Sequence, residues 1–525
     1  MKQTSISCSN DRLNVLLPRI KNFLSNDITE YTMFGRHVRG YRTPDAPSIW
    51  IRDYSDMMRG FRYWESDMKS VVDHFAEMQS ARGWIFDYFT MTPEKVPCEK
   101  ENWAKYVRVP VEADVEFRFV KAAYMAWQAT GDDAWIRGLL PAMDRALEYV
   151  ITDDWRWDAA VKLVKRAYTM DTWDFDYTAG RHSWLNFQIT PDTFWGIMHG
   201  DNSGYFEAFM QMSALYAHLK QAKRSAYWKK QADEIRRRAN KLCFNGEFYT
   251  HFVKRVPVTI EGVDEASQLS LSNAMDINRG MATHRMAVSI LNEYKTRGQR
   301  GDSFAEWYSI DPPFPDGIWG DEKIVKGMYC NGGIMPLVGG EIARAAFEHG
   351  FERYGVETLL KYETLTQSNE SYLWYFPSGE HATIEKSTSP DSSPTDGWGS
   401  SAMLYALIEG LAGIVDEHKL YTRVRLAPRW LAAGCSTARA CAAYGASGAS
   451  IEYEFLYDEP KRTIALEISG KADVALHLLL PDGMKAKKMI VNGKPFAFTN
   501  TKVEQSAYAD AAFAVKNTAT VVVHL

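Results

Sequence analysis

Several features that would assign this chain to a familiar class of proteins are scarce or missing. Only six cysteines occur among 525 residues, with no Cys-x-x-Cys pair, and no zinc-type ligands accompany the closest two, Cys435 and Cys441. This excludes a disulfide-rich scaffold and favours free thiols in a reducing compartment. The twelve histidines form no His-Glu-x-x-His motif, and the chain has neither a phosphate-binding loop nor a dinucleotide-binding glycine motif. We therefore expect no metal and no cofactor.

Long hydrophobic runs and an excess of positive charge are also missing. No run approaches the ~18 apolar residues that cross a bilayer. The first residues lack the apolar core of a signal peptide, which is ~7–15 residues long. The formal net charge is −5, which excludes the electrostatic footprint of a nucleic-acid-binding protein. We expect a soluble, cytoplasmic protein with neither nucleic acid nor membrane as a partner; the sequence does not indicate its oligomeric state.

Aromatic residues, in contrast, are abundant. The chain has 17 Trp, 27 Tyr and 25 Phe, within an overall composition of 46% hydrophobic and 24% charged residues. That overall balance is typical of a globular protein. Trp and Tyr fill a large core, but they also provide flat surfaces on which sugar rings stack.

Helical periodicity extends from about residue 11 to residue 415. One buried stripe consists of Val115, Phe119, Ala122, Ala123 and Ala126, spaced by three and four residues. That helix should end at Gly131, and Asp132 or Asp133 should cap an antiparallel return helix. The layout recurs along the chain, interrupted by long loops that are typical of functional sites: 84–112, 170–200, 301–330 and 368–397. We therefore predict a mainly α fold, in which residues 1–415 form a closed barrel of helical hairpins with these loops on one face.

The pattern changes after about residue 420. Hydrophobic residues alternate with polar ones over 451–455, 464–468 and 474–478, and Asn492-Gly493 is a hairpin-turn dipeptide. These features predict a small antiparallel β domain over residues 420–525.

The first candidate site segment contains Trp50, Arg52 and Asp53. The guanidinium fork of Arg52 and the carboxylate of Asp53 can hold adjacent hydroxyls of one sugar while Trp50 stacks on its ring. In the alternative interpretation, Asp53 is a helix cap and Arg52 is a surface partner.

The second segment places Asp171, Asp174 and Asp176 among the aromatic residues Trp173 and Phe175. Aromatic neighbours would raise the pKa of a partly buried carboxyl group, as a general acid requires. A solvated loop with Asx turns is the alternative.

The third segment carries four carboxylates before Trp398, namely Glu380, Glu385, Asp391 and Asp396. They could face the carboxylates of residues 171–176 across the mouth of the barrel. Two opposed carboxylates are the minimum requirement for glycoside hydrolysis. Spacing alone does not identify the reacting one, because each could equally be a cap, a turn residue or a sugar ligand.

The whole layout resembles the six-hairpin (α/α)6 glycosidases, a group that includes trehalases, glycoside hydrolase family 63, glycogen-debranching enzymes and α-rhamnosidases. Trp173-Asp174-Phe175 is similar to their Glu-Ser-Gly-Trp-Asp-Phe-Ser segment, which implies that Asp174 is the general acid. Asp171 and Thr172 depart from that motif and leave Asp171 and Asp176 as alternatives. Trp50-Ile51-Arg52-Asp53 is similar to the Trp-x-Arg-Asp element that holds the terminal sugar. The region from Glu385 to Trp398 is similar to the one carrying the general base, which implies Glu385, with Asp391 as the alternative.

The resemblance implies an exo-acting glycoside hydrolase that inverts configuration, is α-specific and uses Asp174 as acid and Glu385 as base. The residues expected to contact the sugar are Trp50, Arg52, Asp53, Trp173, Asp176, Asp391, Asp396 and Trp398. One alternative is a sugar epimerase or polysaccharide lyase on the same barrel, with His182, His199 or His251 converging on the pocket. Another is a non-catalytic carbohydrate-binding protein.

Overall fold

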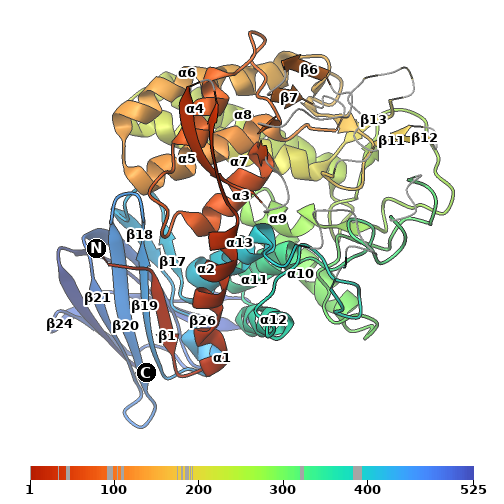
Figure 1. Ribbon diagram of the computed structural model, residues 1–525. Helices are drawn as coiled ribbons and strands as arrows, with labels where there is room; N and C mark the ends of the chain where they lie inside the picture. Colours follow the sequence, from red (N-terminus) through yellow and green to blue (C-terminus); the bar gives the residue numbers. More distant parts are fainter. Residues whose placement is uncertain are drawn as a thin grey trace.

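The computed structural model describes most of the chain, in these ranges: 2–33, 35–42, 48–90, 99–102, 105–107, 111–173, 176–178, 181–183, 189, 191, 193–319, 324–381, 383 and 393–525. Helices dominate up to about residue 411 and strands dominate after it (Figure 1). The expected order of a helical part followed by a β part is confirmed, and the whole is a mixed α/β structure. Within the described ranges, no helix is long and apolar enough to cross a membrane.

Six helices form a continuous inner series. They are α3 (Ile51–Phe61), α5 (Val115–Thr130), α7 (His199–His218), α9 (Ser272–Asn278), α11 (Pro336–Glu348) and α13 (Gly397–Tyr405). Each packs against the next, and α13 packs against α3. These helices are buried almost all round, and every residue of α3 is buried, including its charged ones. These helices therefore lack a one-sided apolar stripe. Their charged residues form ion pairs both with neighbouring inner helices, as Arg59 does with Glu341, and with the segments between helices, as Asp53 does with Arg42.

A second series lies outside the first and carries one buried stripe per helix. It consists of α2 (Leu16–Asn26), α4 (Ser70–Glu77), α6 (Asp133–Thr152), α8 (Ala222–Cys243), α10 (His284–Gly298) and α12 (Glu352–Leu365). Helix α8 buries Trp228, Ala232, Ile235, Ala239 and Cys243, which repeat every three or four positions. A short helix, α1 (Asp11–Asn14), precedes α2, and a π-helical turn over Ala406–Leu411 continues α13.

The hairpin between α5 and α6 forms as the sequence predicts. Gly131 ends α5 in the left-handed conformation, with φ of 71°. Asp132 caps α6 by accepting a hydrogen bond of 2.9 Å from the backbone N–H of Trp135.

Short strands punctuate the segments around the inner helices, and the helical periodicity did not predict them. They are β2 (Ile28–Met33), β3 (Arg36–Tyr41), β4 (Ser48–Trp50), β5 (Tyr88–Thr90), β6 (Glu99–Asn102), β7 (Lys105–Val107), β8 (Trp157–Asp158), β9 (Leu163–Val164), β10 (Arg166–Ala167), β11 (Asp176–Thr178), β12 (Arg181–Ser183), β13 (Trp195–Ile197), β14 (Val253–Lys254), β15 (Leu269–Ser270) and β16 (Ile310–Asp311). They make small two-, three- and four-stranded sheets.

Two larger sheets lie beside the helical part (Figure 1). The seven-stranded sheet has the order β1 (Ser5–Cys8), β19 (Thr437–Ala443), β20 (Ser450–Asp458), β21 (Thr463–Ser469), β27 (Thr518–His524), β23 (Lys488–Val491) and β24 (Lys494–Phe496). The five-stranded sheet has the order β17 (Ile414–Asp416), β18 (Arg423–Leu426), β22 (Ala472–Leu479), β26 (Ser506–Val515) and β25 (Thr499–Val503). The pairing is antiparallel except between β18 and β22, which run parallel. The N-terminal strand β1 therefore belongs to a sheet built otherwise from the C-terminal part of the chain.

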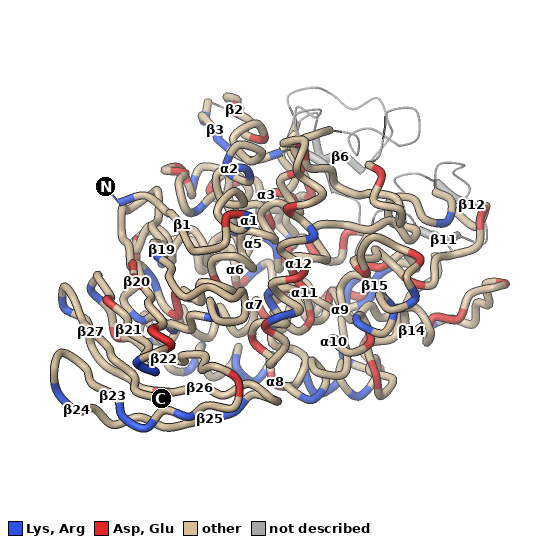
Figure 2. Tube along the Cα trace, turned by 90° about the horizontal axis from the view of Figure 1, so that it is seen from below, with Lys and Arg blue, Asp and Glu red and all other residues tan. Residues whose placement is uncertain are grey.

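The positions of basic and acidic residues are interspersed along the Cα trace in Figure 2. The two parts are joined by ion pairs and hydrogen bonds. Arg425 and Arg429 both pair with Glu348 at the end of α11, at 2.7 and 2.8 Å. The hydroxyl of Tyr453 donates to the carbonyl of Ala412 at 2.7 Å.

Candidate functional site

The N-terminal ends of the inner helices gather at one end of the helical part. Arg52, in the first turn of α3, hydrogen-bonds to Asp114, the residue before α5. A Cβ added to Gly200, at the start of α7, would lie 2.2 Å from Oγ of Ser272, the first residue of α9. These contacts bring together the ends of the long loops that the sequence singles out.

The start of α13 reaches its two neighbours in the same way. A Cβ on Gly399 would lie 2.5 Å from Cβ of Pro336, the first residue of α11, and one on Gly397 would lie 2.8 Å from Cε of Met57 in α3. Only glycine fits this close approach of helix ends. The candidate site therefore lies where the loops enter the N-terminal ends of the inner helices.

Arg52 is held by two buried carboxylates. Its Nε and Nη2 donate to the two oxygens of Asp114 at 3.0 and 2.9 Å, and Nη2 also donates to Glu112 at 2.5 Å. Burial alone would raise the pKa of Asp114, but the guanidinium groups of Arg52 and Arg118 lower it well below its usual value. Arg52 is only 8% exposed, so it is no surface partner; its fork ties α3 to the loop before α5.

Asp53 and Trp50 are also engaged with neighbouring side chains. Asp53 forms an ion pair with Arg42, and the Arg42 guanidinium lies 5.6 Å from the Trp50 ring. Tyr88 stacks on Trp50 with 3.8 Å between ring centroids. The N-cap position of α3 is Trp50, so Asp53 lies within the first turn of the helix and is not the cap.

Asp171 shapes the loop that leads to Trp173. Its backbone has a φ of 47°, which an ordinary side chain adopts only when its surroundings enforce it. Its carboxylate accepts hydrogen bonds from the backbone N–H groups of Thr172 and Ser272, at 2.6 and 3.1 Å, and from the Ser272 hydroxyl. Its own N–H donates to Nε2 of His251 at 2.8 Å. Burial alone would raise the pKa of Asp171, but the charge of His199 and the hydroxyls of Ser270 and Ser272 lower it, so this carboxylate is an anchor and is poorly suited to be a general acid.

His199 and His251 lie beneath this loop and are fully buried. Nδ1 of His199 contacts Asp276 at 2.5 Å, and its Nε2 contacts the Ser270 hydroxyl at 3.2 Å. Burial lowers the pKa of His251 to about 4, so this ring is neutral near pH 7. Both histidines support the loop from below. The side chain of His182 lies outside the described residues.

Aromatic rings join the second and third candidate segments. The centroid of the Trp173 ring lies 5.9 Å from that of Trp398 and 5.2 Å from that of Tyr329, both edge to face. The carbonyl of Trp173 accepts a 3.0 Å hydrogen bond from Arg166, which pairs with the buried Asp201. The structure thus brings the loop ending at Trp173 against the start of α13.

Asp396 caps α13. Its two carboxylate oxygens accept the backbone N–H groups of Trp398 and Gly399, at 3.1 and 2.8 Å. Burial, with a smaller contribution from the charge of Asp53, raises its pKa to about 6. The charge of Asp53 acts on Asp396, so the segment of residues 50–53 and the segment that ends at Trp398 lie close together.

The remaining candidate carboxylates cannot be placed in this geometry. Asp174, Glu385 and Asp391 lie outside the described residues, and for Asp176 only the backbone, in β11, is described. Glu380 is described and its side chain is exposed. Within the described ranges, no three or more His, Cys, Asp or Glu residues are grouped so as to hold a metal ion.

Sequence reasoning missed several residues of this site. Glu112 and Asp114 lie directly before the start of α5, and an acidic pair before a helix is a signal that could have been noticed. Tyr329 and Ser272 carried no comparable signal, because their partners are far away in the sequence.

No protein-family sequence model matches the chain, and no curated protein matches it in sequence. Solved structures do resemble it. An α-L-rhamnosidase from Dictyoglumus thermophilum has 11% identity and a TM-score of 0.58, with 100% of this chain and 51% of that chain covered. An α-L-rhamnosidase from Streptomyces avermitilis, complexed with L-rhamnose, has 11% identity and a TM-score of 0.61, with 99% and 42% covered.

A GH63 mannosylglycerate hydrolase from Thermus thermophilus has 13% identity and a TM-score of 0.53, with 75% of this chain and 99% of that chain covered. The chain thus spans about half the length of the two rhamnosidases. These similarities confirm, at the level of the fold, the resemblance to the six-hairpin glycosidases that the sequence indicated.

Proposed function

We propose that the protein is a glycoside hydrolase whose helical part, predicted from the sequence as residues 1–415, forms an (α/α)6 catalytic barrel. A small β-sandwich domain, predicted as residues 420–525, follows it and also includes β1 and β17. The cyclic packing of the six inner helices, with α13 returning to α3, supports the barrel. The fold-level similarity to rhamnosidases and to a family 63 hydrolase supports the class of reaction.

One observation carries this proposal above the others. The edge-to-face contact between Trp173 and Trp398 joins the two acidic segments that the sequence analysis expects to oppose each other. Asp174 follows Trp173 directly in the chain, and Glu385 and Asp391 precede Trp398 by 13 and 7 positions. Aromatic rings such as these provide a stacking surface for a sugar, and they raise the pKa of a carboxyl group that lies beside them.

In the proposed reaction, Asp174 protonates the glycosidic oxygen of a terminal α-linked sugar. Glu385, or Asp391 in its place, activates a water molecule on the opposite face of the sugar, so that the anomeric configuration inverts. Such a pair requires carboxyl groups roughly 6.5–9.5 Å apart. The proposed sugar contacts are Trp50, Arg52, Asp53, Trp173, Asp176, Asp391, Asp396 and Trp398.

The epimerase or lyase alternative is not favoured by the buried histidines. It requires an imidazole that reaches the substrate, whereas His199 and His251 are fully buried and bonded to protein groups. A purely sugar-binding protein would bind the same ligands without turnover, so activity distinguishes it.

The test is a panel of aryl α- and β-glycosides, including rhamnosides, glucosides and mannosides, assayed for release of the aryl alcohol. We expect hydrolysis of an α-glycoside by the native chain. Asp174→Asn and Glu385→Gln should each reduce kcat at least ~100-fold, the usual contribution of a general acid or base. Asp154→Asn, an exposed site outside the loops, is the matched control and should leave kcat unchanged. Full activity of Asp174→Asn would remove that residue from the mechanism.

A further inference from the structure

A cavity of about 160 Å³ lies inside the ring of inner helices, and we call it the axial cavity. Each of the six inner helices contributes to its lining, through Arg59, Lys121, Glu207, Met275, Glu341 and Tyr405. These residues lie well inside their helices or at the helix ends, whereas the candidate active site lies at the helix starts. On α3, Arg59 follows Arg52 by seven positions (59 − 52), which is about 10 Å along the helix axis at ~1.5 Å per residue.

A chain of buried ion pairs runs from the candidate active site to the axial cavity. Arg118 pairs with Asp114, the partner of Arg52, at 3.3 Å and with Asp56 at 2.6 Å. Asp56 also accepts a hydrogen bond of 3.2 Å from Lys121, which lines the cavity. The axial cavity is therefore a separate space that lies beyond these charges.

Four buried polar atoms on side chains that line the axial cavity have no hydrogen-bond partner within the described part of the chain. Two are donors, Nη2 of Arg59 and Nε of Arg62, and two are acceptors, Oε2 of Glu207 and Oε1 of Gln211. Arg59 and Arg62 are only 5% and 6% exposed, so bulk water does not satisfy them. Because a buried polar atom without a partner costs free energy, a molecule that bonds to these atoms is stabilised in the cavity.

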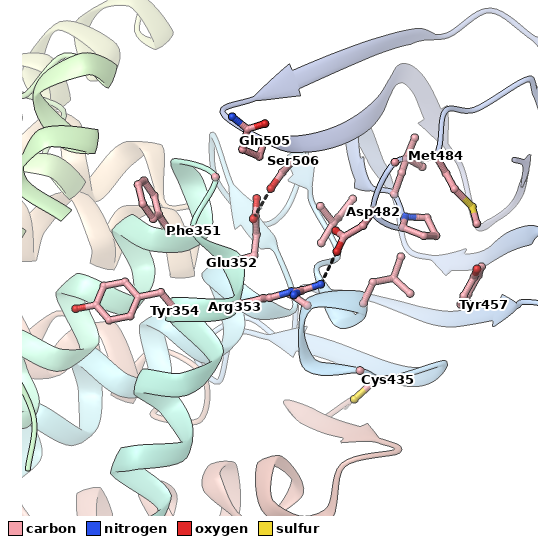
Figure 3. A pocket seen from close by; sticks show the side chains of 18 of the residues that line it. Phe351, Glu352, Arg353, Tyr354, Cys435, Tyr457, Asp482, Met484, Gln505 and Ser506 are labelled. Carbon is pink, nitrogen blue, oxygen red and sulfur yellow. Dashed lines mark hydrogen bonds and ion pairs between the residues drawn. The ribbon is translucent and has the colours of Figure 1, made fainter. Parts of the chain in front are cut away.

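A larger cleft at the start of α12 differs in this respect (Figure 3). Its volume is about 840 Å³, but polar groups bond to each other across it: Arg353 pairs with Asp482, and the Ser506 hydroxyl donates to Glu352 at 2.6 Å. Among the residues that the structure describes, no side chain lining this cleft has a buried polar atom without a partner. The unsatisfied atoms therefore single out the axial cavity as the candidate binding site.

The charges around the axial cavity indicate the class of ligand. Four basic and four acidic side chains line it, so their formal charges cancel. Arg59 pairs with Glu341 and Arg62 pairs with Glu409, so both guanidinium groups retain N–H donors while their charges are compensated. Such a lining favours a neutral ligand that both donates and accepts hydrogen bonds, which is the property of a hydroxyl group. An apolar ligand would leave all four atoms unpaired.

We propose that the axial cavity binds a small neutral polyol. Its hydroxyl oxygens accept hydrogen bonds from Arg59 and Arg62, and its O–H groups donate to Glu207 and Gln211. The volume corresponds to about five water molecules at ~30 Å³ each, which limits the ligand to about three or four carbon atoms. The Glu207 side chain is 25% exposed, which leaves this part of the lining open to solvent. The site does not depend on glycoside hydrolysis.

The test is a calorimetric titration of the full chain with erythritol, a polyol of four carbon atoms. We expect saturable binding of one erythritol per chain, and much weaker binding of butane-1,4-diol, which lacks the two inner hydroxyl groups. Gln211→Met removes one acceptor and should weaken erythritol binding about 2–10-fold, the effect of one neutral hydrogen bond. Gln221→Met is the matched control and should leave the affinity unchanged, because Gln221 is an exposed glutamine before α8 whose side chain makes no cap bond.

Trp398→Ala distinguishes the axial cavity from the candidate active site. It should leave the erythritol affinity unchanged, and loss of binding would place the polyol at the candidate active site and overturn the proposal. The proposal would also be overturned if the native chain showed no saturable binding, which would leave the cavity to water alone, or if it bound glycine or acetate more tightly than erythritol. The native chain and Trp398→Ala decide the result even if Gln211→Met folds poorly.

Discussion

Arg52 separates two roles that the sequence could not distinguish, a grip on the sugar and a structural anchor. In Arg52→Met the side-chain volume is nearly kept, but Asp114 and Glu112 lose the guanidinium that donates hydrogen bonds to them at 2.5–3.0 Å. Both carboxylates are buried, with exposures of 0% and 1%. Breaking a buried ion pair from one side costs about 3–5 kcal/mol, so we expect the free energy of unfolding to fall by that amount. Arg52→Lys keeps the positive charge but cannot donate to both carboxylates as the guanidinium does, and we expect its free energy of unfolding to fall by about 1–3 kcal/mol.

The assay is urea unfolding followed by tryptophan fluorescence. Arg137→Met, on the exposed face of α6, is the matched control, and its free energy of unfolding should lie within ~0.5 kcal/mol of that of the native chain. The pKa of Asp114 is lowered in the folded protein, so its contribution is present above the unfolded pKa of ~3.9 and is lost as the pH falls. The deficit of Arg52→Met should therefore shrink in acid. Unchanged stability at pH 7 would refute the anchoring role, and a raised KM without a stability change would favour the sugar contact.

Three further predictions concern the loop and the aromatic wall. Ser272→Ala removes the hydroxyl that donates to the charged Asp171. We expect the free energy of unfolding in urea to fall by about 1.5–3 kcal/mol and kcat to fall with little change in KM. The control Ser447→Ala, in an exposed turn, should change neither the stability nor the kinetics. Trp398→Ala removes the edge-to-face partner of Trp173 and should weaken the binding of the product sugar, measured by titration calorimetry. Trp398→Phe should partly restore this binding. Equal affinity of the native chain and both variants would contradict a role of Trp398 in stacking on the sugar. The pKa of Asp396 is raised to about 6 in the folded protein, whereas the unfolded chain releases this proton near pH ~3.9. The contribution of Asp396 to the free energy of unfolding should therefore fall as the pH rises from ~4 to ~6. Asp396→Asn should flatten that part of the pH profile, and an unaltered slope would show that Asp396 does not titrate there.

The sequence predicted the presence and ends of helices from local patterns. The apolar stripe of 115–126 identified the helix α5, although the structure buries α5 almost all round. The hairpin at Gly131 and Asp132 follows from local rules of helix capping, and the change to strands after residue 420 follows from the change in period. The charged residues of the inner helices do not follow such local rules. In α3, Arg52, Asp53 and Arg59 are all buried, and each forms an ion pair with a residue outside α3.

The candidate site was predictable in composition but not in roles. Trp173 and Trp398 were both expected to contact the sugar, and the structure shows their rings in contact with each other. Asp171 was considered as an acid, but its backbone conformation and its bonds to Ser272 come from a segment about 100 residues away. The joining of β1 to β19 likewise depends on pairing across nearly the whole chain, for which a four-residue segment gives no local signal.

The most direct test of the central claim is proton NMR of the first product formed during hydrolysis of the preferred α-glycoside. The released sugar should show the β-anomeric signal before mutarotation, as inversion by two opposed carboxylates requires. Release of the α-anomer would contradict the inverting mechanism. Failure to hydrolyse any α- or β-glycoside, by a folded protein that still binds sugar, would contradict the assignment as a glycoside hydrolase.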